Sequence, residues 1–207
     1  MKKQMKKTVT RGLICLIILG MFLITLAPTI TAKKAPRPKI PGISIQLYQG
    51  MNLITMPIEN DYTAESLGQV IAGCTTVTMF NAESQTFLTH VVGTPHDNFE
   101  IQNGVAYYVF VTDDTRIILT GEVIKSVNVE IFSGSNFVGC YSKEPVSAEV
   151  IGQSIPGCTV IIIFDHIIGQ YITHVVGTPH DNFIIPPGTG VLAFSITKGD
   201  VWTGYLL

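Results

Sequence analysis

Thr89 to Phe99 reads Thr-His-Val-Val-Gly-Thr-Pro-His-Asp-Asn-Phe, and the same eleven residues recur from Thr173 to Phe183. The two copies are 84 residues apart, and a shift of 84 superimposes residues 47–110 on the second half of the chain without a gap. Self-similarity at a fixed spacing indicates tandem structural repeats. We therefore predict two homologous modules, at residues 44–124 and 128–207 of the 207-residue chain.

The pattern within one module predicts a β-rich fold. β-branched and aromatic residues on both sides of Gln49–Gly50 indicate two strands joined by a tight turn. Thr63 as a cap, apolar residues at helical spacing and Gly73 as a stop predict a helix of roughly ten residues. Four further strands are predicted at 75–80, 86–92, 106–111 and 115–120.

The predicted fold class is therefore mainly β with one short helix per repeat, a β-rich α+β arrangement of two sandwich-like or barrel-like modules. Each module has roughly 80 residues, a size at which a private core is marginal. We therefore expect the two modules to pack on each other.

Charge is distributed unevenly along the chain. Nine of the 13 basic residues lie at or before Lys39, and all 15 acidic residues lie at or after Glu59. The part after Lys39 thus carries a net charge of −11, from 4 basic and 15 acidic side chains. This balance argues against nucleic acid as a partner, because phosphate binding needs a concentrated basic face.

The N-terminus has the pattern of a secretory leader. An apolar run at residues 12–27 follows a basic cluster, and Ala32 is a suitable residue before a cleavage point. Residues 1–32 are therefore predicted to be a signal peptide, or a signal anchor if the leader is retained, with everything after residue 32 exported. Residues 33–43 are predicted to be a proline-rich linker. Membrane contact is expected only through the N-terminal segment.

A resemblance to a known repeat family emerges from the turn and core residues. Gly50-Met-Asn-Leu-Ile-Thr-Met-Pro57, followed by Gly-Thr-Pro-x-Asp-Asn-Phe and by Gly104-Val-Ala-Tyr-Tyr108, resembles the "Gly-Trp-Asn-Leu-Ile-Ser-Leu-Pro" repeats of exported cell-surface proteins, many of them archaeal. Met51 and Ser135 stand where those repeats have Trp, and Val191 stands where the second module should have Tyr. The resemblance implies a surface or envelope module and transfers no catalytic residue.

The repeated segment supplies the candidate ligand-binding residues. They are His90, His96 and Asp97, mirrored by His174, His180 and Asp181. Imidazole and carboxylate groups of this kind bind divalent transition metals such as zinc, and an exposed loop of this composition suits a carbohydrate or peptide. The alternative is structural, with a strand, a polar turn and Phe99 as a core anchor.

Three cysteines, Cys74, Cys140 and Cys158, follow the leader. In an exported protein a Cys140–Cys158 disulfide is one arrangement, provided that each helix joins neighbouring strands. A Cys74–Cys158 bridge across the repeats and three buried free thiols are the other two.

Motifs of the common enzyme classes are absent from the sequence. It has no Gly-x-Ser-x-Gly elbow, no phosphate-binding Gly-x-x-x-x-Gly-Lys, no His-Glu-x-x-His and no dinucleotide fingerprint. A thiol hydrolase is a remote alternative, because nucleophilic catalysis needs at least a thiolate and an imidazole. The pairs that could supply them are Cys74 with His90 and Cys158 with His174.

We thus expect an exported, non-enzymatic surface or envelope protein without a cofactor. Its expected roles are structural, adhesive or recognition roles, and its expected partners are envelope or extracellular components, including glycans. A metal- or glycan-binding module that uses the repeated segment is the alternative.

Overall fold

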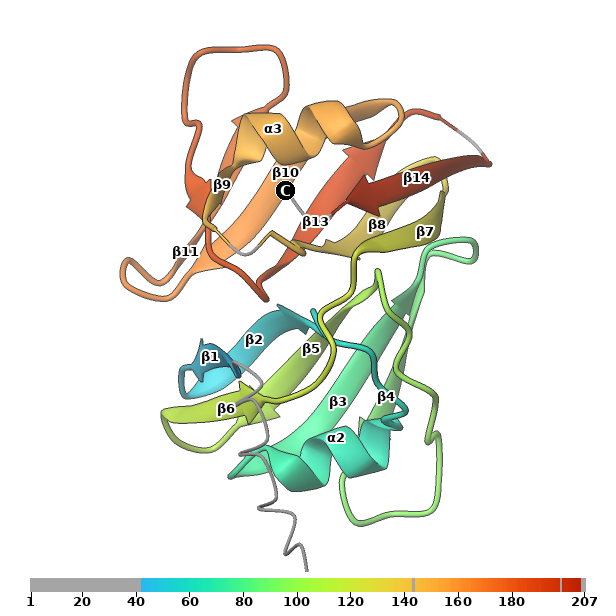
Figure 1. The fold of residues 1–207 in the computed structure, drawn as a ribbon, viewed down its shortest axis with the longest axis vertical. Helices are drawn as coiled ribbons and strands as arrows, with labels where there is room; N and C mark the ends of the chain where they lie inside the picture. The colour runs from blue at the N-terminus through green and yellow to red at the C-terminus, as the bar shows by residue number, and fades with distance from the viewer. Residues whose placement is uncertain (1–41, 143, 198, 206–207) are drawn as a thin grey trace, which may run out of the picture. The chain divides into compact units, whose positions relative to one another are not determined.

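Both repeats contain two strands, a helix and four further strands in the same order in the computed structural model, which describes residues 42–142, 144–197 and 199–205 (Figure 1). The first repeat contains β1 (Ile43–Leu47), β2 (Gly50–Thr55), α2 (Ala64–Val70), β3 (Cys74–Asn81), β4 (Thr86–Val91), β5 (Ala106–Val111) and β6 (Thr115–Leu119). The second contains β7 (Ser126–Ile131), β8 (Gly134–Gly139), β9 (Val146–Ser147), α3 (Ala148–Ser154), β10 (Cys158–Asp165), β11 (Gln170–Val175), β12 (Ile184–Ile185), β13 (Gly190–Ser195) and β14 (Asp200–Tyr205). The second repeat adds the short strands β9 and β12, where the first has the single bridge Thr63–Glu100. The predicted leader, and the linker up to residue 41, lie outside the described residues.

The sheets confirm the mainly β prediction. Each repeat has a four-stranded antiparallel sheet, ordered β2-β5-β3-β4 in the first repeat and β8-β13-β10-β11 in the second. A separate two-stranded pair accompanies each sheet, β1–β6 and β7–β14. All sheets of the described part stay open, so the barrel-like form of the prediction is wrong. No helix among the described residues is long and apolar enough to cross a bilayer.

The turn at Gln49–Gly50 joins two strands, as predicted, but these strands belong to different sheets. β1 pairs with β6, whereas β2 pairs with β5. Gly50 has a φ of 97°, and the buried Asn52 side chain closes the turn, accepting from Tyr48 N (2.8 Å) and donating to Tyr48 O (2.7 Å). The turn is therefore a corner between two layers.

Helix α2 begins where the sequence predicts. Thr63 is its N-cap, with Ser66 N donating to Thr63 Oγ1 (3.2 Å) and Thr63 N donating to Ser66 Oγ (2.8 Å). The helix has 7 residues and ends before an extended Ile71, so it is shorter than predicted. The apolar spacing in the sequence extends the predicted helix to Ile71, because Ile71 also faces the core although it lies beyond the helix.

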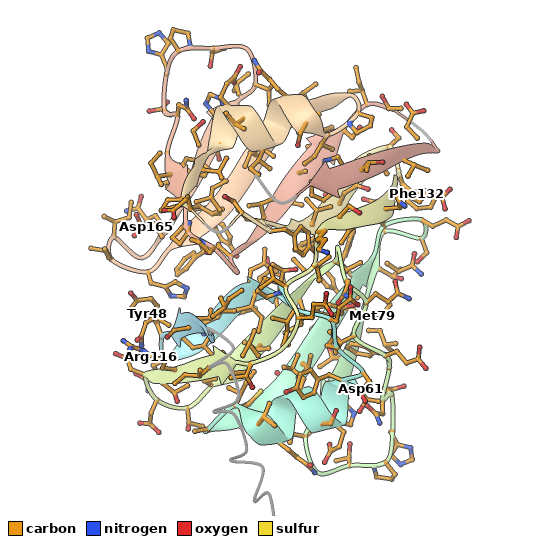
Figure 2. All side chains as sticks on the ribbon, in the orientation of Figure 1. Tyr48, Asp61, Met79, Arg116, Phe132 and Asp165 are labelled. Atoms are coloured by element: carbon orange, nitrogen blue, oxygen red, sulfur yellow. The ribbon has the colours of Figure 1, made fainter. Side chains whose placement is uncertain are left out.

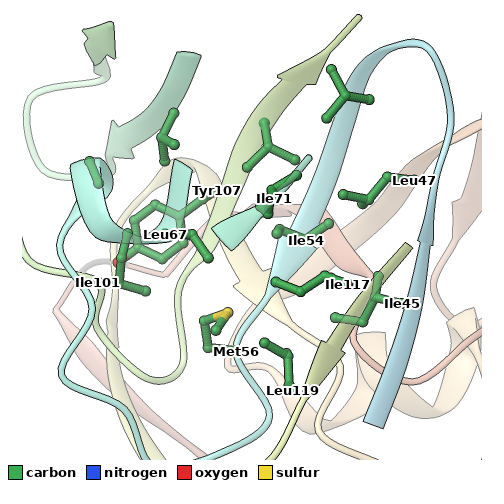
Figure 3. Packing of buried hydrophobic residues seen from close by; sticks show 14 of the residues in the cluster. Ile45, Leu47, Ile54, Met56, Leu67, Ile71, Ile101, Tyr107, Ile117 and Leu119 are labelled. Atoms are coloured by element: carbon green, nitrogen blue, oxygen red, sulfur yellow. The ribbon is translucent and has the colours of Figure 1, made fainter. Parts of the chain in front are cut away.

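The core of the first repeat lies between its two sheets and its helix (Figure 3). Leu67 comes from α2, Leu47 from β1, Leu119 from β6, and Tyr107 from β5. Each of these side chains is at most 2% exposed. An equivalent cluster fills the second repeat, so each repeat has its own core.

The two repeats meet through reciprocal contacts. A bridge joins Val105 to Val138, and the same bridge after a shift of 84 joins Thr189 to Ile54. Gly139 N donates to Gly104 O (3.2 Å), and its counterpart Thr55 N donates to Gly188 O (3.0 Å). Contacts that repeat with the two partners exchanged define a twofold, self-complementary interface. The repeats therefore pack like the two subunits of a symmetric dimer.

Candidate functional site

His90 is the fifth residue of β4, and its ring points into the first repeat. It pairs across the sheet with Val77 and is completely buried. His174 holds the same place in β11, opposite Ile161, and is also completely buried. A buried imidazole needs partners for both ring nitrogens, because an unpaired polar atom in the core costs free energy.

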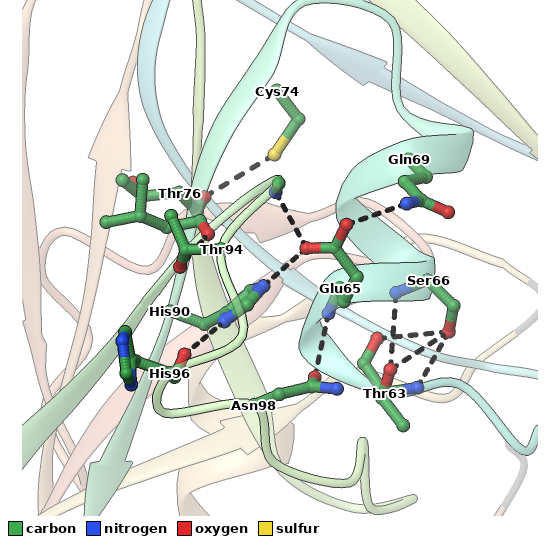
Figure 4. Close-up of polar contacts among 12 residues, drawn as sticks. Thr63, Glu65, Ser66, Gln69, Cys74, Thr76, His90, Thr94, His96 and Asn98 are labelled. Atoms are coloured by element: carbon green, nitrogen blue, oxygen red, sulfur yellow. Dashed lines mark hydrogen bonds and ion pairs between the residues drawn. The ribbon is translucent and has the colours of Figure 1, made fainter.

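Both ring nitrogens of His90 have partners (Figure 4). Nδ1 lies 2.8 Å from the carbonyl oxygen of His96, which only accepts, so Nδ1 donates. Nε2 lies 2.7 Å from Glu65 Oε2, on the first turn of α2. With Nδ1 already protonated, an imidazolium that donates to a carboxylate satisfies both atoms.

Glu65 collects three donors around its carboxylate. Besides His90 Nε2, Gly93 N donates to Oε2 (2.8 Å) and Gln69 Nε2 donates to Oε1 (2.6 Å). The hydrogen bond from His90, followed by that from the Gly93 amide, lowers the pKa of Glu65. The carboxylate is therefore the stable form of this side chain near neutral pH.

The pKa of His90 results from opposing effects. Burial lowers the pKa, but the hydrogen bonds to Glu65 and to the His96 carbonyl raise it, and the outcome is a raised pKa. Glu65 and His90 thus stabilise each other's charged forms. The second repeat has the same geometry, with His174 Nε2 2.6 Å from Glu149 Oε2, and the hydrogen bond from His174 lowers the pKa of Glu149.

The rest of the repeated segment fastens the loop after β4 to the start of α2. Asn98 Oδ1 accepts from Glu65 N (3.0 Å), and Phe99 O accepts from Ala64 N (2.8 Å). Gly93 and Asp97 have φ values of 87° and 55°, which bend the loop back toward the helix. We call this unit, residues 89–99 with Glu65, the latch, and its counterpart is residues 173–183 with Glu149.

The predicted ligand residues do not converge on one site. The side chains of His96, Asp97, His180 and Asp181 are exposed, whereas His90 and His174 are buried with both ring nitrogens engaged. Across the described residues no three His, Cys, Asp or Glu side chains are grouped as metal ligands would be. Each latch makes its hydrogen bonds within its own repeat, and the two loops lie far apart (Figure 1).

The partner carboxylate was not singled out in the sequence, although a signal for it exists. Outside the eleven-residue identity, Glu65, Gly68 and Gln69 are among the few positions that match their counterparts at Glu149, Gly152 and Gln153. Gly68 is needed because a side chain there would meet Val92 of the loop. These matches are explained by the latch, which needs the same helix surface in both repeats.

Cys74, Cys140 and Cys158, the cysteines among the described residues, are free in the structure, so the Cys140–Cys158 disulfide is not formed. The sheet order explains why, because β13 lies between β8 and β10. Cys140 follows Gly139, which pairs with one end of β13, while Cys158 pairs with the other end at Ser195. The two cysteines are therefore separated by roughly 20 Å along the strand direction, whereas a disulfide tolerates a Cα separation of about 7 Å.

No thiolate–imidazole couple forms between Cys74 and His90. Cys74 Sγ donates to Thr76 O (3.4 Å), and burial raises the pKa of Cys74 to about 11. Burial raises the pKa of Cys158 to about 11 as well. Both thiols are protonated near neutral pH, and both histidine rings are committed to the latches.

Comparisons of the chain with protein-family models, with curated proteins and with solved structures find no match.

Proposed function

We propose that this chain is an exported, non-enzymatic protein of the cell surface or envelope, whose paired repeats serve a structural, adhesive or recognition role. The observation that supports it most directly is that the buried imidazole and its partner carboxylate bond to groups of their own repeat. In both repeats the buried imidazole is held by a carboxylate of the helix and by the backbone of its own loop. This chemistry stabilises a loop and leaves no ring nitrogen for a substrate.

The distribution of charge supports export. The basic residues gather before Lys39, in front of and behind the apolar run 12–27, and the described part has a strong acidic excess. A basic cluster before an apolar run is retained on the cytoplasmic side while the following chain is translocated. The resemblance to exported surface repeats leads to the same proposal.

Protease accessibility of intact cells tests this proposal. We expect the full chain, with a C-terminal epitope, to lose that epitope when intact cells are treated with protease. In the matched control, Leu16→Arg and Ile18→Arg interrupt the apolar run, and the epitope should survive until the cells are lysed. N-terminal sequencing of the mature protein then separates cleavage after Ala32 from retention of an anchor. An epitope that is protected in intact cells expressing the unmodified chain contradicts export.

A further inference from the structure

Two grooves flank the contact between the repeats, on opposite sides of it. Figure 2 shows Met79 and Phe132 on one side and Tyr48 and Asp165 on the other. The groove beside Met79 and Phe132, which we call the first groove, has a cavity volume of about 550 Å³. The groove beside Tyr48 and Asp165, the second groove, has a volume of about 450 Å³. Both volumes are in the usual range for small-ligand sites.

The two grooves are built from equivalent positions. Phe80 and Phe132 line the first groove, and their counterparts after a shift of 84, Phe164 and Tyr48, line the second. The twofold arrangement of the repeats therefore generates each groove from the same backbone. Any difference in their chemistry comes from the side chains alone, which makes the second groove an internal reference for the first.

The chemistry of the two grooves is different. Four lining positions have hydrogen-bonding side chains in the first groove and apolar ones in the second. They are Glu83, Glu100, Gln102 and Asn103, against Ile167, Ile184, Pro186 and Pro187. The fold does not require polar residues at these positions, because the second groove forms without them. The polar lining of the first groove is therefore specific to that side of the molecule.

A side-chain link joins the two repeats next to Asn136, which lines the first groove. The Gln85 amide spans the two repeats, donating from Nε2 to Ser135 O (3.0 Å) and accepting at Oε1 from Ser135 N (3.0 Å). The counterpart of Gln85 is Gly169, which has no side chain to form such a link. In the second groove the His166 ring instead stacks on Tyr48, with centroids 4.7 Å apart. The first groove thus has a hydrogen-bonded side-chain link between the repeats beside it, whereas the second groove has an aromatic stack between them.

The lining restricts the class of ligand. No Lys, Arg or His side chain lines the first groove, so nothing there would neutralise an anion. Carboxylates only accept hydrogen bonds, and the exposed Glu83, Glu100 and Glu130 therefore suit a ligand rich in hydroxyl donors. Phe80 packs against Phe87 and Phe137, with ring centroids 4.8 and 4.7 Å away, so it supports the wall of the groove. The half-buried ring of Phe132 suits a flat apolar ring face. Hydroxyl groups around an apolar ring face are the chemistry of a sugar.

We propose that the first groove binds a neutral oligosaccharide. The proposal rests on the exported, non-enzymatic function proposed above and identifies the recognition surface of that function. It places recognition at the junction between the repeats and not at the duplicated loops, whose histidines hold the latches.

Isothermal titration of the purified full chain tests the site. The probes are neutral tetrasaccharides of glucose, mannose, galactose and N-acetylglucosamine, with spermidine as a cationic comparison. We expect at least one tetrasaccharide to bind, and Phe132→Ala and Glu100→Gln each to weaken that binding about tenfold or more, the loss expected for a stacked ring or a charged hydrogen bond. Tyr48→Ala, the change in the second groove that matches Phe132→Ala, should leave the affinity unchanged. Circular dichroism establishes that each variant is folded.

Three outcomes overturn the inference. The first is the absence of tetrasaccharide binding at millimolar concentration, and the second is binding of spermidine alone. The third is an equal loss of affinity in Tyr48→Ala and Phe132→Ala. Each of these outcomes leaves the protease test of export untouched, so a failed sugar site and a failed export proposal are distinguishable.

Discussion

At the residue scale, His90 has the environment of a charged group although it is buried. Its ring has lost contact with water, which favours the neutral form, yet a carboxylate and a carbonyl oxygen compensate at its two nitrogens. The Glu65 side chain remains 23% exposed, so the pair lies at the boundary between core and solvent. The stability that this pair contributes should therefore depend on the pH of the solvent.

The stability of the first latch should depend on pH in a defined direction. The pKa of His90 is raised above its ordinary value of 6.5, so its contribution is complete below pH 6.5 and is lost as the pH rises through the raised value. The pKa of Glu65 is lowered below 4.5, so its contribution is complete above pH 4.5 and is lost as the pH falls through the lowered value. The latch is therefore strongest between these two ordinary values.

Denaturant unfolding of the wild type and of His90→Gln across pH 4 to 9 measures this dependence. The difference in unfolding free energy between the two proteins should be largest between pH 4.5 and 6.5, and it should fall as the pH rises above 6.5 through the raised pKa of His90. His96→Gln is the control, because its ring is exposed and only its backbone carbonyl serves the latch. A difference that grows toward alkaline pH would contradict the charged pair.

The cysteines give a second prediction at this scale. Because burial raises the pKa of Cys74 and Cys158 to about 11, their thiolate fractions at pH 8 should be roughly a hundredfold below those of cysteines at the ordinary value. We expect slow alkylation by iodoacetamide in the folded protein. In denaturant without reductant, Cys74, Cys140 and Cys158 should all react rapidly. Peptide mapping that finds two of them unmodified under those conditions would reveal a disulfide.

At the scale of elements, α2 is too short to be stable alone. A helix of seven residues lies well below the length at which isolated helices persist in water. The Thr63 cap, the core contact of Leu67 and the hydrogen bonds of Glu65 compensate for this short length. The latch is therefore as much a device for holding the helix as for holding the loop.

Close packing of the helix on the loop predicts the effect of a single methyl group. In Gly68→Ala the new Cβ would meet the Val92 side chain, and Gly152 has the same relation to Val176. Alanine favours a helix over glycine by about 1 kcal/mol, but overpacking typically costs about 1–3 kcal/mol. We expect a net loss of about 1 kcal/mol, measured by urea unfolding.

A second change in the loop tests the cause of that loss. Val92→Ala should recover stability in the Gly68→Ala background, because it removes the methyl groups that the new Cβ would meet. The predicted overpacking is contradicted if Gly68→Ala alone is more stable than the wild type. That result would show that the loop shifts to accept the new methyl group without a loss of stability.

The sequence predicted local features of these elements better than their pairing. Thr63 and Gly73 marked the helix because a cap and a positive φ depend on nearby atoms. Strand positions followed from side-chain alternation. That β1 and β2 separate into two sheets depends on distant residues, such as Thr115, 68 positions after its partner Leu47, and Ala106, 51 positions after its partner Thr55. No local pattern contains this information.

The candidate site shows the same division. The repeated segment marked His90 as important, but its chemical role depends on Glu65, which lies 25 residues earlier in the sequence. Spacing alone did not distinguish a metal ligand from a buried ion pair, because both use a histidine near a carboxylate. The fold resolves this by bringing helix and strand together on one side of the core.

At the scale of the whole molecule, the twofold packing brings some equivalent residues face to face. Thr55 and Gly139 are counterparts in the two repeats, and a Cβ at Gly139 would meet the Thr55 side chain. Two equivalent side chains compete for one space near the axis, so only one of them is retained. The Thr55 hydroxyl uses that space to bond Tyr141 Oη (3.0 Å) and Val105 O (3.0 Å). The backbone contacts of the interface are thus symmetric, whereas the side chains at Thr55 and Gly139 are not.

This asymmetry gives a prediction about the coupling of the repeats. Gly139→Ala should cost about 1–3 kcal/mol of unfolding free energy, because the new methyl group overpacks against Thr55. Trp202 is the only tryptophan and lies in the core of the second repeat, so its fluorescence reports that repeat, whereas circular dichroism reports both. In the wild type the two signals should give one urea transition, and in Gly139→Ala the transition should shift or separate. Adding Thr55→Gly vacates the space and should restore part of the loss, although the hydroxyl bonds are gone. If Gly139→Ala unfolds like the wild type by both signals, the repeats do not depend on close packing at this axis.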